Sequence, residues 1–191
     1  MSSAPRILVT VLATSGLLGC TSTPVRIDST PQGLEAATIG SDDVIAVLPS
    51  QGAPGYPETG EIAGHLLTSA LVGLGEALPS SQVRQYVEAT RLAPTEFEIE
   101  ALKEAAGKLG ADVLIWSSVR QYTPYSWTNR LAPATPPYVE LTLHVYRAGS
   151  DRVLKLSGRK QGKLPATIRS RQPTFEDVAR PVMIELVASW R

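Results

Sequence analysis

Side chains that often carry chemistry are scarce in this sequence, which has one cysteine and two histidines among 191 residues. Cys20 has no partner for a disulfide within the chain, so its thiol is free for another use. His65 and His144 show no metal-ligand spacing, and the sequence has no nucleophile elbow. We therefore predict no catalytic site, no metal site and no bound cofactor, and we expect the protein not to be an enzyme.

The thiol of Cys20 follows a segment, residues 1–19, with the features of a secretory signal peptide. One positive charge, on Arg6, precedes an apolar run over residues 7–18. A run of about a dozen residues is shorter than the roughly 20 that cross a bilayer as a helix. We expect cleavage after Gly19, so that Cys20 begins the mature chain.

The order Leu17, Leu18, Gly19, Cys20 resembles the bacterial lipobox. The resemblance implies that a diacylglyceryl group is attached to the Cys20 thiol before cleavage. Several acyl chains on one residue hold a protein firmly at a membrane. Thr21, rather than Asp, follows Cys20, and by resemblance to lipoprotein sorting rules this implies the outer membrane. The expected location is the cell envelope, at the periplasmic face of the outer membrane.

The overall composition is neutral, with 18 Lys and Arg against 18 Asp and Glu. No basic run exceeds two residues, so the sequence predicts neither a nucleic-acid partner nor a polybasic membrane patch. Residues 20–41 are rich in Ser, Thr, Pro and Gly, which predicts a flexible tether. Residues 42–191 are enough for one α/β envelope domain.

The first part of this domain predicts a strand, a helix and another strand. The continuous apolar run over residues 44–48 suits a strand buried on both faces. The glycine-rich loop at 50–57 lacks the ending of a phosphate-binding loop, so we interpret it as a plain connection. Thr59 is expected to cap a helix that ends before Pro79. Residues 82–88 alternate weakly, which predicts a shorter strand near an edge.

The middle of the domain predicts a helix and a strand. Thr95 and Glu98 form the pattern of a capping box, and Gly110 ends the helix that this box begins. Residues 111–119 then form a strongly apolar strand.

The last part predicts an antiparallel hairpin and a final helix. Residues 138–146 alternate, with 139, 141, 143 and 145 on the core face and 140, 142, 144 and 146 on the wet face. The returning strand, 152–163, is basic, which we interpret as protection of a sheet edge. Thr174 caps the final helix, with Asp177 completing the cap, and we expect this helix to restart at Pro181. The fold class is therefore α/β, a mixed sheet of about five strands packed by about three helices.

An aromatic, proline-rich segment over residues 121–137 is the main candidate for partner binding. The side chains that suit an interface are Tyr122, Tyr125, Trp127, Arg130 and Tyr138. The same rings would also suit a structural role, covering the open end of the sheet. The sequence leaves both interpretations open.

The strand ending in Val47, Leu48 and Pro49, the segment 110–115 and the closing hairpin resemble a group of envelope lipoproteins. This group comprises relatives of the curli-export lipoprotein CsgG, the Pel-polysaccharide export lipoprotein PelC and the amino-terminal domain of TolB. A lipoprotein family of the domain-of-unknown-function type is a closer resemblance. The resemblance implies an α/β lipoprotein that acts without chemistry, often as an oligomer.

Two functions follow as expectations. The first is an accessory or scaffold component of secretion, transport or envelope assembly, which acts through an envelope protein partner or as a homo-oligomer. The alternative is a binding module for a small molecule or a cell-wall glycan, with the aromatic segment 122–138 as a stacking platform.

Overall fold

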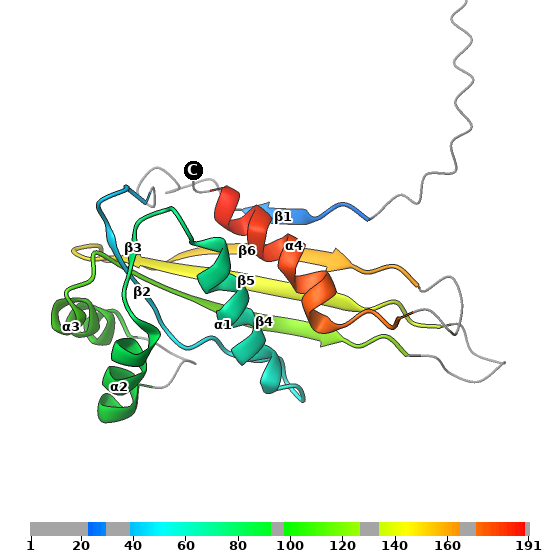
Figure 1. Ribbon diagram of the computed structural model, residues 1–191, viewed down its shortest axis with the longest axis horizontal. Coiled ribbons are helices and arrows are strands. Elements are labelled where there is room, and N and C mark those ends of the chain that lie inside the picture. Colours follow the sequence, from blue (N-terminus) through cyan, green and yellow to red (C-terminus); the bar gives the residue numbers. More distant parts are fainter. Residues whose placement is uncertain (1–22, 30–38, 93–97, 127–133, 165–170, 190–191) are drawn as a thin grey trace, which may run out of the picture.

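One mixed β-sheet organises the chain (Figure 1). The structure is a computed structural model, and it describes residues 23–29, 39–92, 98–126, 134–164 and 171–189. The strands are β1 (Arg26–Ser29), β2 (Val44–Val47), β3 (Glu76–Ala77), β4 (Val113–Thr123), β5 (Tyr138–Arg147) and β6 (Leu154–Gln161). The helices are α1 (Glu58–Ala70), α2 (Ser80–Thr90), α3 (Ile99–Leu109) and α4 (Phe175–Ala188). The predicted α/β class with a mixed sheet is confirmed, with six strands and four helices in the described ranges.

The strand order is β1-β6-β5-β4-β2-β3, with a parallel part and an antiparallel part. β2 runs parallel to both β3 and β4, whereas β4, β5, β6 and β1 pair antiparallel. A bulge between Val119 and Gln121 shifts the register of β4 against β5. The predicted hairpin is confirmed: β5 and β6 are joined by a turn in which Gly149 adopts a positive φ of 82°.

Apolar side chains form two cores, one on each face of the sheet. The larger core lies under α1 and α4, which pack side by side on one face (Figure 1). The smaller core joins β2, β4 and the end of β5 to α2 and α3. Ile45 belongs to the larger core and Ala46 to the smaller one, and both are fully buried. The prediction that this strand is buried on both faces is therefore confirmed.

The predicted strand at residues 82–88 is wrong, because this segment belongs to α2. Val83, Tyr86 and Val87 are spaced three and four residues apart, which places them on one face of a helix. Val83 is buried in the smaller core, and the other two pack against it. The weak alternation in the sequence came from the same residues viewed with the wrong period.

Part of the predicted tether also belongs to the sheet. Residues 26–29 form β1 and pair antiparallel with residues 156–159 of β6. β6 is therefore paired on both sides over these residues, and the interpretation as edge protection is wrong for Arg159, which lies among them. Val25 and Ile27 pack against the larger core and alternate with polar residues, but this alternation is too short to have distinguished a strand from the surrounding polar segment.

The helices α1 and α3 begin at other residues than predicted. α1 begins at Glu58, with Pro57 as its N-cap residue. Thr59 is buried instead, and its Oγ1 accepts a hydrogen bond from the Ala53 amide at 2.9 Å and donates one to the Tyr56 carbonyl at 2.6 Å. α3 has Glu98 at its N-cap, not at its third position, while Thr95 lies outside the described residues. Gly110 ends α3 with a φ of 66°, as predicted.

The capping box of α4 is confirmed. The Asp177 amide donates to Thr174 Oγ1, and the Asp177 carboxylate accepts from the Thr174 amide at 2.7 Å. The predicted restart at Pro181 is wrong, because α4 continues through this residue. Proline removes one helical hydrogen bond, but Ala179 and Val182, on either side of Pro181, are fully buried and hold the helix against the sheet. Within the described ranges, no helix combines the length and apolar character needed to cross a bilayer.

Candidate interaction surface

The five side chains predicted for partner binding do not form one cluster. Trp127 and Arg130 lie outside the described residues. Tyr122 and Tyr138 lie on opposite faces of the sheet, because Tyr122 pairs with Val139 in the register, one position away from the pair Thr123 and Tyr138. Tyr125 follows the end of β4 and is half-buried.

Tyr122 closes the end of the larger core. Its ring makes edge-to-face contacts with Tyr56 and Phe175, at centroid distances of 5.2 Å and 5.1 Å. Burial raises the pKa of the Tyr122 hydroxyl, and the nearby Tyr56 adds to this effect. For Tyr122 the structure thus favours the covering role over partner binding.

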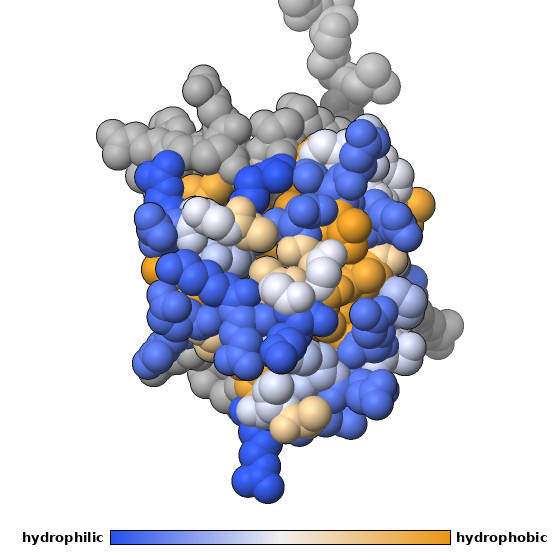
Figure 2. All heavy atoms as spheres, turned by 90° about the vertical axis from the view of Figure 1, so that its left-hand side faces the viewer, coloured by the Kyte–Doolittle hydropathy of each residue, from blue (hydrophilic) through white to orange (hydrophobic). Residues whose placement is uncertain are grey.

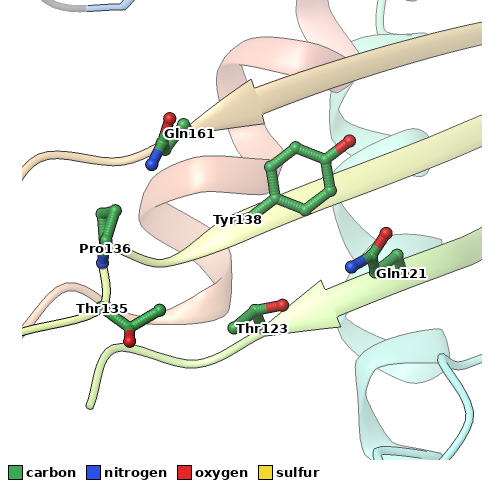
Figure 3. A pocket seen from close by; sticks show the side chains of 6 residues that line it. All are labelled: Gln121, Thr123, Thr135, Pro136, Tyr138 and Gln161. Carbon is green, nitrogen blue, oxygen red and sulfur yellow. The ribbon is translucent and has the colours of Figure 1, made fainter.

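Tyr138 faces the other side of the sheet and lines a shallow pocket of about 290 Å³. Its hydroxyl donates to Glu140 Oε2 at 3.3 Å, and burial raises the pKa of this hydroxyl. Figure 3 shows the lining side chains, which come from the ends of β4, β5 and β6 and from the segment before β5. They are uncharged: Gln121, Thr123, Thr135, Pro136, Tyr138 and Gln161. Amide and hydroxyl groups that both donate and accept hydrogen bonds therefore surround one aromatic ring.

The pocket lies at one end of a wider polar surface that we call the open sheet face. It comprises the side chains of β4, β5, β6 and β1 that point away from α1 and α4. Near β2 the smaller core covers this side of the sheet, but no described helix packs on it over β6. The expectation of a wet face on β5 is partly wrong, because Thr142 and Tyr146 are buried. Tyr146 packs in the smaller core, a contact that strand alternation alone does not predict.

Hydroxyl groups connect the strands across the open sheet face. Thr142 Oγ1 and Ser157 Oγ lie 2.9 Å apart, and Arg120 Nε donates to Thr142 Oγ1 at 3.3 Å. Ser118 Oγ and His144 Nε2 lie 2.8 Å apart. These contacts fix the Arg120 and His144 side chains on the surface of the sheet.

His144 does not simply decorate a wet surface, as the alternation suggested. Its ring stacks on Trp116, with a centroid distance of 5.0 Å and an interplanar angle of 6°. The pKa of His144 is lowered to about 4, mainly by burial and in addition by the positive charges of Lys155 and Arg120. This imidazole is therefore neutral at pH 7.

The open sheet face carries mainly positive charge. Arg120 and Lys155 are exposed, and Arg159 lies opposite Glu140 in the register of β5 and β6. Arg26 pairs with Arg159 in the register of β1 and β6. Among the described side chains of this face, four cations therefore stand against one carboxylate, that of Glu140. The sequence indicated a basic β6, but β1 and the β4 bulge were needed to bring Arg26 and Arg120 to the same surface.

The glycine-rich loop before α1 packs closely on its neighbours. Its backbone extends β2 along β4: the Gln51 amide donates to the Ser117 carbonyl at 2.9 Å, and the Val119 amide donates to the Gln51 carbonyl at 2.8 Å. A Cβ on Gly52 would lie 2.3 Å from the Pro57 carbonyl oxygen. The glycine therefore permits close packing of the loop on the start of α1.

Residues with catalytic potential remain dispersed. In the described part of the chain, no three His, Cys, Asp or Glu side chains gather as metal ligands. His65 Nε2 lies 3.9 Å from Glu61 Oε1, and both side chains are exposed to solvent. Cys20 lies outside the described residues.

Exposed apolar side chains are few among the described residues. The large ones are Val72, Leu164 and Ile184. Figure 2 views the end of the domain that carries α2 and α3, and shows a largely hydrophilic surface interrupted by an apolar area. Polar and charged side chains therefore make up most of the described surface that a partner could contact.

No protein-family model and no curated protein matches the sequence. Solved structures do match. PelC from Paraburkholderia phytofirmans, solved as a dodecamer, aligns over 87% of this chain and 96% of its own, with a TM-score of 0.54 and 15% identity. The fold resembles that of PelC. The predicted resemblance is confirmed at this level, while the resemblance to CsgG and TolB stays a prediction.

Two further structures align over shorter parts of the chain. The LpoB carboxy-terminal domain from Salmonella enterica covers 69% of this chain and 90% of its own, with a TM-score of 0.47 and 14% identity. A lipoprotein from Neisseria meningitidis covers 62% and 83%, with a TM-score of 0.44 and 16% identity.

Proposed function

We propose that this protein is a lipid-anchored envelope lipoprotein that acts without catalysing a reaction, as an accessory or scaffold component of secretion, transport or envelope assembly. It works through self-association or contacts with an envelope protein. The observation that carries the proposal is the PelC-like fold over most of the chain, since the PelC structure is a dodecamer. The resemblance of residues 17–20 to a lipobox supports the anchor, and Thr21 after Cys20 supports the outer-membrane location.

The anchor is tested by labelling cells with palmitate. We expect the chain to take up label and to fractionate with membranes, and Cys20→Ser to lose both properties. Ser22→Ala is the matched control, because it changes a neighbouring polar residue and leaves the thiol intact. A Cys20→Ser chain that still fractionates with membranes contradicts the anchor.

Association is tested by sedimentation of the full chain in mild detergent, together with crosslinking in cells. We expect assemblies larger than a monomer, or a reproducible crosslinked envelope protein. A chain that stays monomeric at every concentration and captures no envelope protein contradicts the proposal.

The pocket at Tyr138 favours a second candidate, a binding module for a neutral cell-wall glycan. Its uncharged amides and hydroxyls suit sugar hydroxyls, and the Tyr138 ring offers a stacking surface. The aromatic segment predicted for this role contributes Tyr138, on the side of the sheet opposite Tyr122.

This candidate is tested by co-sedimentation with purified peptidoglycan. We expect Gln121→Ala combined with Gln161→Ala to lose retention, since both amides line the pocket. Gln82→Ala, on the exposed surface of α2, is the control. Equal retention of the unchanged chain, the double variant and the Gln82→Ala control rules out the pocket as a glycan site.

A further inference from the structure

The two sides of the domain that the sheet separates carry opposite charge. On one side lies the open sheet face, with Arg26, Arg120, Lys155 and Arg159. On the other side lie α1 and α4, which pack together over the larger core (Figure 1). We call the solvent-exposed surface of these two helices the helix face.

The helix face is acidic. α1 exposes Glu58 and Glu61 and carries no lysine or arginine. α4 exposes three carboxylates, those of Glu176, Asp177 and Glu185. Two arginines offset part of this charge: Arg180 pairs with Glu176, and Arg171, just before the helix, pairs with Asp177. The helix face therefore carries five carboxylates and only two guanidinium groups.

We propose that the open sheet face of one copy docks on the helix face of a second copy of this chain. The inference rests on the proposed self-association and names its surfaces. Charge complementarity selects the partner, because the chain itself carries the acidic surface that the basic face requires. Ile184, a large apolar side chain that is 52% exposed, lies on the helix face and supplies apolar contact area.

The two faces lie on opposite sides of one domain, so the contact is head-to-tail. An open assembly of docked copies always has one unoccupied open sheet face and one unoccupied helix face. Further copies therefore add to it, and the assembly either closes into a ring or grows as a filament. A two-fold dimer, in which the same face meets itself, would oppose like charges. Burial is the main cause of the lowered pKa of His144, and the positive charges of Lys155 and Arg120 on the same face add to it.

The test compares two charge-reversed variants of the full chain by sedimentation in mild detergent. The sheet variant carries Arg120→Glu and Lys155→Glu, and the helix variant carries Glu61→Lys and Glu185→Lys. We expect each variant alone to self-associate about tenfold more weakly or worse, because like charges then face each other. Raising the salt from about 0.05 M to about 0.5 M weakens association of the unchanged chain in the same direction.

Mixing the two variants is the decisive step. The sheet variant then presents an acidic sheet face and the helix variant a basic helix face, so every contact between unlike variants is complementary. We expect the mixture to recover assemblies that neither variant forms alone. A matched control carries Arg84→Glu and Lys108→Glu, which reverse two cations on the exposed surfaces of α2 and α3, and associates like the unchanged chain.

Several outcomes overturn the inference. Variants that associate normally, or a mixture that stays dissociated while the unchanged chain assembles, remove the docking surfaces but leave self-association intact. A control that dissociates as strongly as the variants shows that net charge, not position, matters. An unchanged chain that stays monomeric removes self-association itself. Urea unfolding of each variant separates lost docking from lost folding.

Discussion

At the scale of single residues, two glycines in helices have opposite roles. Gly60 lies in the first turn of α1, where an added Cβ would be 2.6 Å from the Gly52 nitrogen and 2.7 Å from the Ser50 carbonyl oxygen. Gly107 lies in α3, where an added Cβ would meet no heavy atom within 4 Å. Helix propensity alone would treat the two positions alike.

We predict that Gly60→Ala destabilises the protein by about 1–3 kcal/mol, because the backbone of the loop before α1 must move to admit the methyl group. Gly107→Ala, the matched control, is expected to stabilise it by up to about 1 kcal/mol. Both values are measured by urea unfolding. Equal effects from the two substitutions would contradict the close packing of this loop on α1.

His144 provides a second prediction at this scale. Because burial lowers its folded pKa to about 4, the unfolded chain, with an ordinary histidine pKa of about 6.5, binds the proton more readily. This contribution to stability is complete above about pH 6.5 and is lost as the pH falls towards 4. NMR titration is expected to find His144 neutral at pH 6. A folded pKa for His144 above 6 would contradict its burial against Trp116.

At the scale of elements, the sequence was most informative where several signals agreed. β2, β5 and the start of α4 were predicted because apolar period, turn residues and caps pointed the same way. α2 was misassigned because its few apolar residues fit two periods. β3 is only two residues long and shows no period, and the alternation in β1 extends over too few residues to indicate a strand.

The capping box formed by Thr174 and Asp177 stabilises the start of α4. Hydrogen bonding from the Thr174 amide lowers the pKa of Asp177 most strongly, and Thr174 Oγ1 and Arg171 lower it further. Thr174→Ala is expected to cost about 1 kcal/mol at pH 7. The contribution of Asp177 is present above about pH 4, the ordinary pKa of aspartate, and is lost as the pH falls through its lowered folded pKa. Urea unfolding at pH 7 and pH 3 measures both effects, and an unchanged midpoint for Thr174→Ala would contradict the cap.

At the scale of the whole molecule, one ion pair joins distant parts of the chain. Arg147, at the end of β5, donates from Nη2 to Asp43 Oδ2 at 2.6 Å and from Nη1 to Asp43 Oδ1 at 3.2 Å. Asp43 also accepts from the Gly40 amide at 2.6 Å. The Arg147 hydrogen bonds are the main reason why the pKa of Asp43 is lowered.

We predict that Asp43→Asn destabilises the protein by about 1 kcal/mol at pH 7. The difference from the unchanged chain shrinks as the pH falls from about 4, the ordinary pKa of aspartate, through the lowered folded pKa of Asp43, because the carboxyl is then neutral in both the folded and the unfolded chain. Asp42→Asn, at the exposed neighbouring residue, is the control for loss of one charge. Parallel unfolding curves for the unchanged chain and Asp43→Asn at pH 7 would contradict the role of this pair.

The candidate surface was less predictable than the fold. The aromatic segment was recognised, but strand alternation sends Tyr122 into the core and Tyr138 to the opposite side. The basic open sheet face needs β1, which pairs Arg26 with Arg159, and the register shift after Val119 in β4. Sequence patterns describe one segment at a time, whereas this surface arises from four strands.

The incorporation of β1 into the sheet also limits how far the folded domain stands from the bilayer. With the lipid on Cys20, as proposed, only five residues, 21–25, and thus six Cα–Cα steps separate the anchor from Arg26, the first residue of β1. Fully extended, they span at most about 20 Å. The β1 edge of the sheet therefore stays close to the lipid headgroups. The short linker holds the whole domain near the membrane surface. A partner must approach it at the membrane, in the layer where diffusion is confined to two dimensions.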